Sequence, residues 1–214
     1  LMYKTAHVTA RPVDVLLALD IETTGLDPHI STLCEVACVV WDVTNDQMVT
    51  TMDLRCRVPA ECFIRECNDY VLKMHRDSGL LAACSDGAGA ASEAEVLRRL
   101  LYLMESLPAS TCSMTITGAN AATFDVPYLK VRAAALGLQW PEGVISHRVL
   151  DLGSMAAGYL RRPLPVRSDD VFSTLGIRTE GQRLIVEAVG ACVPTSIDEV
   201  AARFSAMHEI RVET

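Results

Sequence analysis

The sequence predicts an α/β fold in which a mixed sheet is flanked by helices. Three strand-like segments follow one another in the first sixty residues, and helix-like and strand-like segments alternate after them. That order is typical of a strand meander that continues into a helix-covered sheet. The chain has 214 residues, of which 50% are hydrophobic, which is enough for one sizeable core. We therefore expect a single domain over residues 13–210, preceded by an N-terminal extension at residues 1–12.

The three consecutive strands are expected at residues 13–19, 34–41 and 48–58. The second of them, "CEVACVVW", is a nearly continuous apolar run. The turn-rich segments "TTGLDPH" and "VTNDQ" separate the three strands, and the second segment has the length of a hairpin loop.

Two helices are predicted next, at residues 64–75 and 92–107. The longer one begins with Ser92 as the N-cap and Glu95 three residues later, which is the pattern of a capping box, and it stops before Pro108. The Gly- and Ala-rich stretch at residues 85–92 is a connector within the domain.

The rest of the chain supplies two more strands and several helices. The strands are expected at residues 114–118 and 144–152, separated by a helix over residues 125–136 that Gly137 closes. Further helices are predicted at residues 152–160, 169–175, 182–192 and 196–209. The sheet is therefore predicted to have five strands.

Composition narrows the possible partners and the cellular location. Nineteen basic and twenty-seven acidic residues give a net charge of −8, which disfavours a protein that coats long nucleic acids but permits small anionic substrates. The eight cysteines include no C-x-x-C pair and are interpreted as small apolar residues in a reducing compartment. No run approaches the roughly 18 apolar residues of a membrane helix, so we expect a cytoplasmic protein without a membrane partner.

Two acids follow the first predicted strand within "LLALDIETTGLDP". Residues two apart in a strand project to the same face, so Asp20 and Glu22 direct two carboxylates into one small volume. Divalent Mg²⁺ or Mn²⁺ would relieve their repulsion, because hard cations prefer carboxylate oxygens. The alternative is a solvated strand end, where acids are ordinary.

The stretch "ALDIETTGLDP" resembles the first motif of the DEDD (DnaQ-like) 3′-to-5′ exonucleases, and "ITGANAATFDVPYLK" resembles the second, with Asn120 in its loop and Asp125 at the helix start. Asp125 alone could merely complement the helix dipole. The resemblance implies a ribonuclease H-like fold and a two-metal site that hydrolyses phosphodiesters. In that site Asp20 would bridge both metals, with Glu22, Asp125 and a fourth acid completing the ligand set.

Within this family, "YVLKMHRDSGLL" and "SHRVLDLGSM" resemble the oligoribonuclease branch. The resemblance implies a homodimer in which Arg148 reaches the neighbouring subunit's site, with His147 standing where the branch usually has an aromatic residue. It also implies that Leu26 wedges against the 3′ base, that Tyr70 stacks on it, and that His75 and Arg148 hold phosphate oxygens. The full set of predicted substrate-binding residues is Thr24, Leu26, Tyr70, His75, Asn120, His147 and Arg148.

The third family motif, H-x-x-x-x-D, does not occur in the sequence. The best register, in "GQRLIVEAVGA", puts Gln182 at the position of the general-base His and Glu187 at the position of the fourth metal ligand. Glutamate can bind a divalent cation, but glutamine cannot accept a proton at neutral pH. Asp169 and Asp170 are an alternative source of the fourth acid, although they also fit an N-cap pair.

Three functions remain open from the sequence. The first is an Mg²⁺- or Mn²⁺-dependent 3′-to-5′ exonuclease that hydrolyses dinucleotides or short RNA or DNA oligonucleotides to 5′-mononucleotides. The second is a weakened or inactive relative that only binds nucleotides or short oligonucleotides, which Gln182 would explain. The third is a proofreading-type exonuclease that acts on single-stranded DNA.

Overall fold

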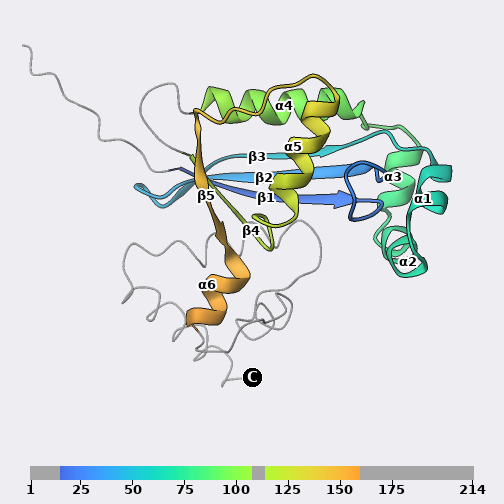
Figure 1. Ribbon diagram of the computed structural model, residues 1–214, viewed down its shortest axis with the longest axis horizontal. Coiled ribbons are helices and arrows are strands. Elements are labelled where there is room, and N and C mark those ends of the chain that lie inside the picture. The colour runs from blue at the N-terminus through green and yellow to red at the C-terminus, as the bar shows by residue number, and fades with distance from the viewer. Residues whose placement is uncertain (1–14, 108–113, 160–214) are drawn as a thin grey trace, which may run out of the picture.

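The computed structural model describes residues 15–107 and 114–159 of the chain, and Figure 1 labels their helices and strands. Several predictions lie outside these residues. They are the extension at residues 1–12, the start of the first strand, and the helices at residues 169–175, 182–192 and 196–209.

A five-stranded mixed sheet forms the centre of the described structure, in the order β3-β2-β1-β4-β5. β1 pairs antiparallel with β2 and parallel with β4, β2 pairs antiparallel with β3, and β4 pairs parallel with β5. The predicted mixed sheet flanked by helices is thereby confirmed. The strand bounds are β1 Val15–Thr23, β2 Leu33–Asp42, β3 Gln47–Arg55, β4 Met114–Gly118 and β5 Ile145–Asp151.

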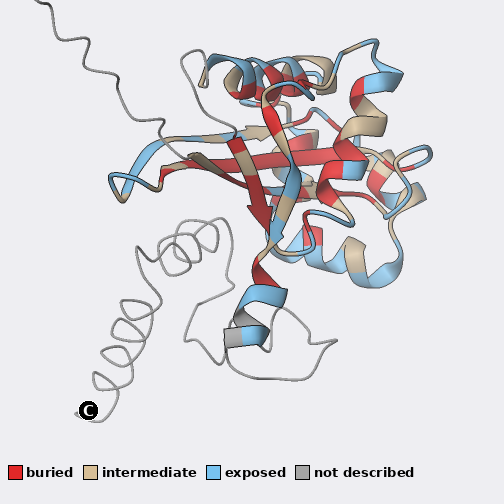
Figure 2. Ribbon diagram, turned by 60° about the vertical axis from the view of Figure 1, so that its left-hand side comes forward, coloured by how far each residue is buried: buried red, intermediate tan, exposed pale blue. Residues whose placement is uncertain are grey.

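β1 is the middle strand, and it continues four residues past its predicted end. The main core cluster includes every second residue of this strand from Leu17 to Ile21, namely Leu17, Leu19 and Ile21. Ala18, between them, belongs to a smaller cluster with Ala37 and Val39 on the neighbouring strand. Because side chains alternate between the two faces of a strand, both faces of the sheet bury apolar residues here, and Figure 2 shows the buried colour running along the central strands.

Helices α4 (Glu93–Ser106) and α5 (Asp125–Ala135) lie together on one side of the sheet (Figure 1). Both predictions of their ends are confirmed. The Ser92 hydroxyl accepts a hydrogen bond from the Glu95 amide at the start of α4. Gly137 follows α5 with a φ of 70°, a left-handed conformation that glycine adopts without steric cost and that is common after a helix.

Three short helices gather at the end of the sheet toward which β1 points (Figure 1): α1 (Ala60–Glu66), α2 (Asp69–Asp77) and α3 (Leu80–Ser85). The prediction of one helix at residues 64–75 was wrong in two respects: α1 begins earlier, and the helix is interrupted. Cys67 is extended, and the Asn68 side chain accepts from the Val71 amide to start a new helix. The prediction also missed α3, which Gly79 starts with a φ of 80°.

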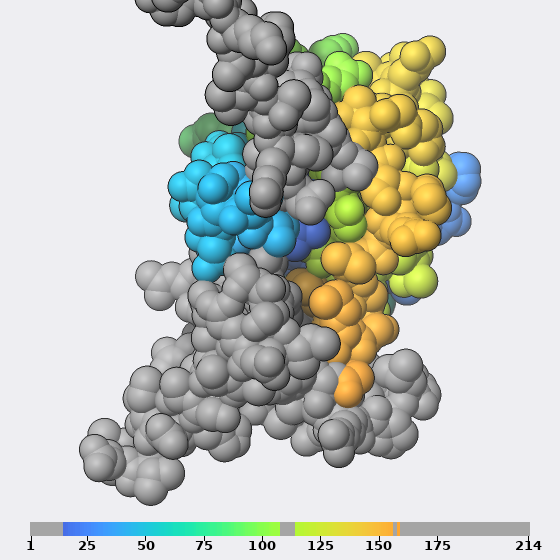
Figure 3. Space-filling view, turned by 90° about the vertical axis from the view of Figure 1, so that its left-hand side faces the viewer, coloured from blue at the N-terminus to red at the C-terminus, as the bar shows by residue number. Residues whose placement is uncertain are grey.

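β5 forms the edge of the sheet opposite β3, and α6 (Leu152–Tyr159) follows it directly. Both lie at the surface along one flank in Figure 3. Of the described helices, none combines the length and the apolar character needed to cross a bilayer. The six described cysteines are free, and four of them are buried.

Candidate functional site

The carboxylates of Asp20 and Glu22 lie on the same strand, two residues apart, near the end of β1. The neighbouring position on β2 is also acidic, because Glu22 is paired in register with Glu35. Arg55 on β3 is the next residue across the sheet, and its Nε donates to the Glu35 carboxylate at 2.9 Å. Among these contacts, Arg55 neutralises Glu35, and none places a positive charge beside Asp20 or Glu22.

Asp125 is brought to this strand end by the turn after β4. Its Oδ1 accepts a hydrogen bond from the backbone amide of Ile21 at 3.0 Å, and Ile21 stands between the two acids of β1. Asp125 is only 2% exposed. The first residue of α5 is thus fixed against the strand that carries Asp20 and Glu22, although more than one hundred residues separate them.

The turn from β4 to α5 depends on two unusual backbone positions. At Gly118, an added Cβ would lie 2.4 Å from the Leu19 carbonyl oxygen, so only glycine allows this approach of β4 to β1. Asn120 has a φ of 60°, and its carbonyl accepts from the amides of Thr123 and Phe124, both at 2.9 Å. These contacts shape the turn that delivers Asp125.

The three carboxylates interact electrostatically, and the pKa of each is raised. Desolvation by burial, followed by the charge of Asp20, raises the pKa of Asp125 to about 7. Desolvation and then Asp20 raise the pKa of Glu22 to about 7, with smaller contributions from Glu35 and Asp125. Asp20 keeps an exposed surface, yet desolvation and Glu35 raise its pKa to about 6.

Carboxylates that repel one another in a partly desolvated site are the donor set that a hard divalent cation prefers. Asp20, Glu22 and Asp125 therefore fit Mg²⁺ or Mn²⁺ in chemistry. Among residues 15–107 and 114–159, however, no group of three or more His, Cys, Asp and Glu side chains is arranged to hold a metal ion. A complete ligand set would need a further donor or a different arrangement of these three side chains.

Two predicted substrate-binding residues are buried and have structural partners. The Thr24 side chain is fully buried, and its hydroxyl donates to Glu66 Oε2 at 2.6 Å. His75 is 1% exposed, and its Nε2 lies 2.8 Å from the carbonyl oxygen of Thr23. Both contacts therefore hold the end of β1 in place. His75 does so from α2, and Thr24 does so by binding Glu66 of α1.

Two other predicted substrate-binding residues are large apolar side chains on the surface. Leu26, in the loop after β1, is 82% exposed, and Tyr70, in the first turn of α2, is 77% exposed. Burying them in the protein would have been favourable. Their exposure at this end of the sheet leaves both side chains available for contact with a ligand.

The remaining predicted substrate-binding residues lie around β5. His147 and Arg148 are exposed on this edge strand, and Asn120 is exposed in the turn after β4. Asp151, at the end of β5, accepts from the Asn120 amide at 2.7 Å through Oδ2 and from the Ser154 amide at 2.7 Å through Oδ1. One carboxylate thus joins the β4–α5 turn to the start of α6.

Gln182 and Glu187, the predicted general-base position and fourth ligand, lie outside the described residues, as do Asp169 and Asp170.

Sequence reasoning missed several residues that shape this site. Gly118 could have been noticed because it ends a predicted strand just before the Asn120 loop. Glu66 and Arg132 carry no such signal, since the loop residues and the Glu93 side chain that they contact are 34 to 104 residues away in the sequence. Their contacts are visible only in three dimensions.

No protein-family model and no curated protein matches the sequence. Solved structures do match its fold. A product-bound structure of exonuclease I has a TM-score of 0.65 at 16% identity, covering 93% of this chain and 47% of that one. A zinc-bound E. coli ExoI–ssDNA complex has a TM-score of 0.63 at 16% identity, covering 92% and 42%.

A 3′-exonuclease described as recognising the 3′ end of a histone mRNA stem-loop also matches. It has a TM-score of 0.57 at 14% identity, covering 85% of this chain and 64% of that one. The chain thus spans about half the length of exonuclease I. At these identities the comparisons establish the fold, which is the ribonuclease H-like fold found in these exonucleases.

Proposed function

We propose that this protein is a divalent-metal-dependent 3′-to-5′ exonuclease that hydrolyses dinucleotides or short oligonucleotides to 5′-mononucleotides. The observation that carries the proposal is the docking of Asp125 on the Ile21 amide, which brings a third carboxylate to the strand holding Asp20 and Glu22. The fold, which exonucleases share, supports the same chemistry.

Different side chains would have different roles in this reaction. Asp20, Glu22 and Asp125 would hold two divalent ions, with Glu187 as the fourth ligand, and the ions would supply an activated water and stabilise the leaving oxygen. Leu26 and Tyr70, both exposed, would pack on the 3′-terminal base. His75 would act by holding the Thr23 carbonyl, and so the end of β1, in place.

In this proposal, Gln182 lowers the rate of hydrolysis and does not change the binding of metal ions. A general base typically contributes about 10²- to 10⁴-fold, and an amide cannot replace it. We expect a slow enzyme, and a Gln182→His substitution should accelerate it.

Purified protein incubated with a 5′-labelled dinucleotide and Mn²⁺ should release a labelled mononucleotide, and EDTA should stop the reaction. Asp20→Asn and Asp125→Asn should abolish the product, whereas Glu105→Gln, an exposed acid on α4, should not. Absence of product from the wild-type chain, with an active related exonuclease in parallel, would contradict the proposal. Product from both Asn variants would assign it to another site or a contaminant.

A second candidate is a proofreading-type exonuclease on longer single-stranded DNA, favoured by the likeness to the exonuclease I structure that is described as an ssDNA complex. Parallel assays on a dinucleotide and on a 5′-labelled 20-nucleotide DNA distinguish the two. A preference for the longer strand would support this candidate.

The third candidate binds short oligonucleotides without cleaving them, and Gln182 is the observation that favours it. Calorimetry would then detect dinucleotide binding without turnover, and Gln182→His combined with Glu187→Asp should introduce hydrolysis.

We also propose a homodimer in which Arg148 of one subunit contacts substrate in the other, in keeping with its exposure on the edge strand β5. Sedimentation at micromolar concentration should give twice the monomer mass. A monomer would remove this role of Arg148.

A further inference from the structure

The loop from Thr24 to Thr32, which follows β1, combines a closed backbone with exposed apolar side chains. Its two ends are joined by the Thr24 amide, which donates to the Thr32 carbonyl at 3.0 Å. Inside it, the Asp27 carbonyl accepts from the amides of Ile30 and Ser31 at 3.2 and 2.8 Å. Yet Leu26 and Ile30 are 82% and 74% exposed, so packing of its own apolar side chains does not hold this loop.

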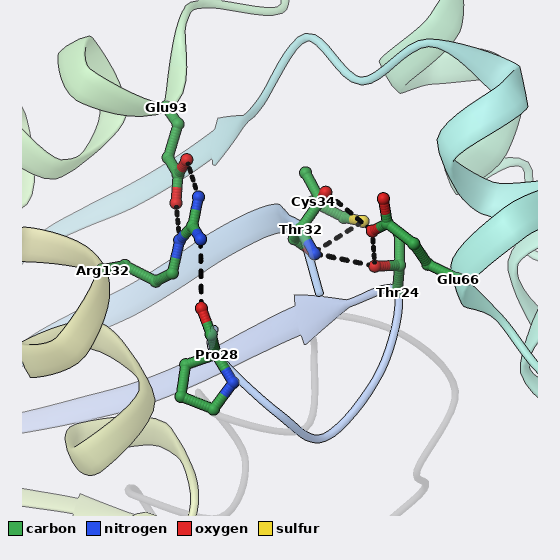
Figure 4. A network of polar contacts seen from close by, with 7 residues as sticks. All are labelled: Thr24, Pro28, Thr32, Cys34, Glu66, Glu93 and Arg132. Atoms are coloured by element: carbon green, nitrogen blue, oxygen red, sulfur yellow. Dashed lines mark hydrogen bonds and ion pairs between the residues drawn. The ribbon is translucent and has the colours of Figure 1, made fainter. Parts of the chain in front are cut away.

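Glu66, the last residue of α1, fastens the base of the loop (Figure 4). Its Oε2 accepts from the hydroxyls of Thr24 and Thr32, at 2.6 and 2.8 Å. Its Oε1 accepts from Arg65 at 2.5 Å, and its side chain is only 10% exposed. Burial alone would raise the pKa of Glu66, but the three donors lower it below its usual value, so the carboxylate is charged at neutral pH.

Arg132, on α5, fastens the middle of the same loop. Its guanidinium donates to the Pro28 carbonyl at 3.0 Å, and Figure 4 shows it lying between that carbonyl and Glu93. Glu93, at the start of α4, accepts two hydrogen bonds from Arg132, both at 2.6 Å. Paired hydrogen bonds of this kind fix the orientation of the guanidinium, and the two side chains are 20% and 17% exposed.

Glu66 and Arg132 connect the loop to the helices that surround the site. α5 carries Asp125 at its first residue and Arg132 two turns later, so one helix sets both a carboxylate of the site and the position of Pro28. α1 supplies Glu66 from the opposite side of the loop. The polar atoms of Glu66 and Arg132 bond in these contacts to the loop, to Arg65 and to Glu93.

We propose that Glu66 and Arg132 are positioning residues that hold residues 24–32 in their binding shape, so that Leu26 meets the terminal base of the substrate without rearrangement. This inference rests on the proposed exonuclease function. A loop that is already ordered loses less conformational entropy when it binds. The substrate therefore binds more tightly than it would to a mobile loop, while the chemistry at the carboxylates is unchanged.

The test compares Leu26→Ala, Glu66→Gln and Arg132→Lys with the Glu105→Gln control in steady-state hydrolysis of a dinucleotide with Mn²⁺. Each of the three substitutions should raise KM by roughly 5- to 20-fold and change kcat less than about twofold. Lysine keeps the charge of Arg132 but cannot donate to Glu93 and Pro28 in the same geometry. Thermal melting should confirm that each variant is folded.

The deciding result is a double-mutant cycle between Leu26→Ala and Glu66→Gln. If Glu66 acts through Leu26, the double variant should have about the KM of the single Leu26→Ala variant. KM increases that multiply, or a fall in kcat alone, would overturn the inference while leaving the proposed function intact.

Hydrogen exchange supplies a readout that does not depend on activity. The hydrogen-bonded amides of Thr24, Ile30 and Ser31 should exchange at least about fivefold faster in Glu66→Gln and Arg132→Lys than in the wild-type chain, with those of α4 unchanged. Unchanged exchange in both variants would overturn the inference even if the wild-type chain hydrolyses nothing. Absence of hydrolysis by the wild-type chain would instead contradict the proposed function.

Discussion

Replacing Asp125 by Asn should stabilise the metal-free protein at pH 8. The amide oxygen of asparagine can still accept from the Ile21 amide, as Asp125 Oδ1 does, so the substitution removes charge but keeps the contact. The buried charge is costly because desolvation and Asp20 raise the pKa of Asp125 from 3.8 to about 7. Between these values the folded protein retains a proton that the unfolded chain has released, so stability falls as pH rises through that window.

The size of the effect follows from the pKa change. Each pKa unit corresponds to about 1.4 kcal/mol, so the cost at pH 8 is at most ~4 kcal/mol. Part of it is repulsion shared with Asp20, so we expect the variant to gain about 2–4 kcal/mol at pH 8. That is a rise in Tm of roughly 5–15 °C for a chain of this size. At pH 4, near the unfolded pKa, the gain should be under about 1 kcal/mol.

Thermal and urea unfolding in EDTA, at pH 4 and pH 8, measure this difference directly, with Glu105→Gln as the exposed-acid control. Adding Mn²⁺ at pH 8 should then stabilise the wild-type chain and have little effect on the variant. The reasoning is refuted if Asp125→Asn is no more stable than wild type at pH 8, or if its advantage is the same at both pH values.

Three further predictions follow from the described contacts. Gly118→Ala should lower the free energy of unfolding by about 1–3 kcal/mol, because the new Cβ would lie 2.4 Å from the Leu19 carbonyl; urea titration measures it, and a neutral result would refute the close approach. Ser92→Ala should cost about 1 kcal/mol through loss of the bond from the Glu95 amide, whereas Ser92→Thr should retain most of it in the same titration. Mn²⁺ should raise Tm more at pH 8 than at pH 5, since the raised pKa values of Glu22 and Asp125, both about 7, leave protons to displace at pH 5; an equal shift would contradict a carboxylate site.

Local signals in the sequence were sufficient for most of the sheet and for the two longest described helices. Alternation along β1 separates Leu17 and Leu19 from Asp20, so the direction of the acids follows from strand geometry alone. The ends of α4 and α5 follow from Ser92 and Gly137, whose side-chain and backbone preferences act within a few residues.

The break between α1 and α2 also had a local signal, which the helix-like pattern obscured. Asn68 followed by Asp69 is a typical helix start, and the Asn68 side chain caps α2 as that pattern indicates. A single helix over residues 64–75 is predicted instead.

The environment of the candidate site was less predictable, because its contacts join distant segments. The motif pattern marks Thr24 and His75 as candidates for contact with substrate, yet their polar groups bind Glu66 and the Thr23 carbonyl. Whether a polar side chain faces a ligand or the protein depends on which groups surround it. For Thr24 that group comes from α1, 42 residues away in the sequence, and for His75 it comes from β1, 52 residues away.

The most direct test is a titration of the protein with Mn²⁺ at pH 8 in the presence of a nucleoside 5′-monophosphate. Calorimetry and the electron paramagnetic resonance signal of free Mn²⁺ measure how much of the ion binds. We predict about two bound ions per wild-type chain, and at least tenfold weaker binding by Asp20→Asn and Asp125→Asn but not by Glu105→Gln. Unchanged Mn²⁺ binding in both Asn variants, or none in the wild-type chain, would contradict the claim that these carboxylates form a metal site.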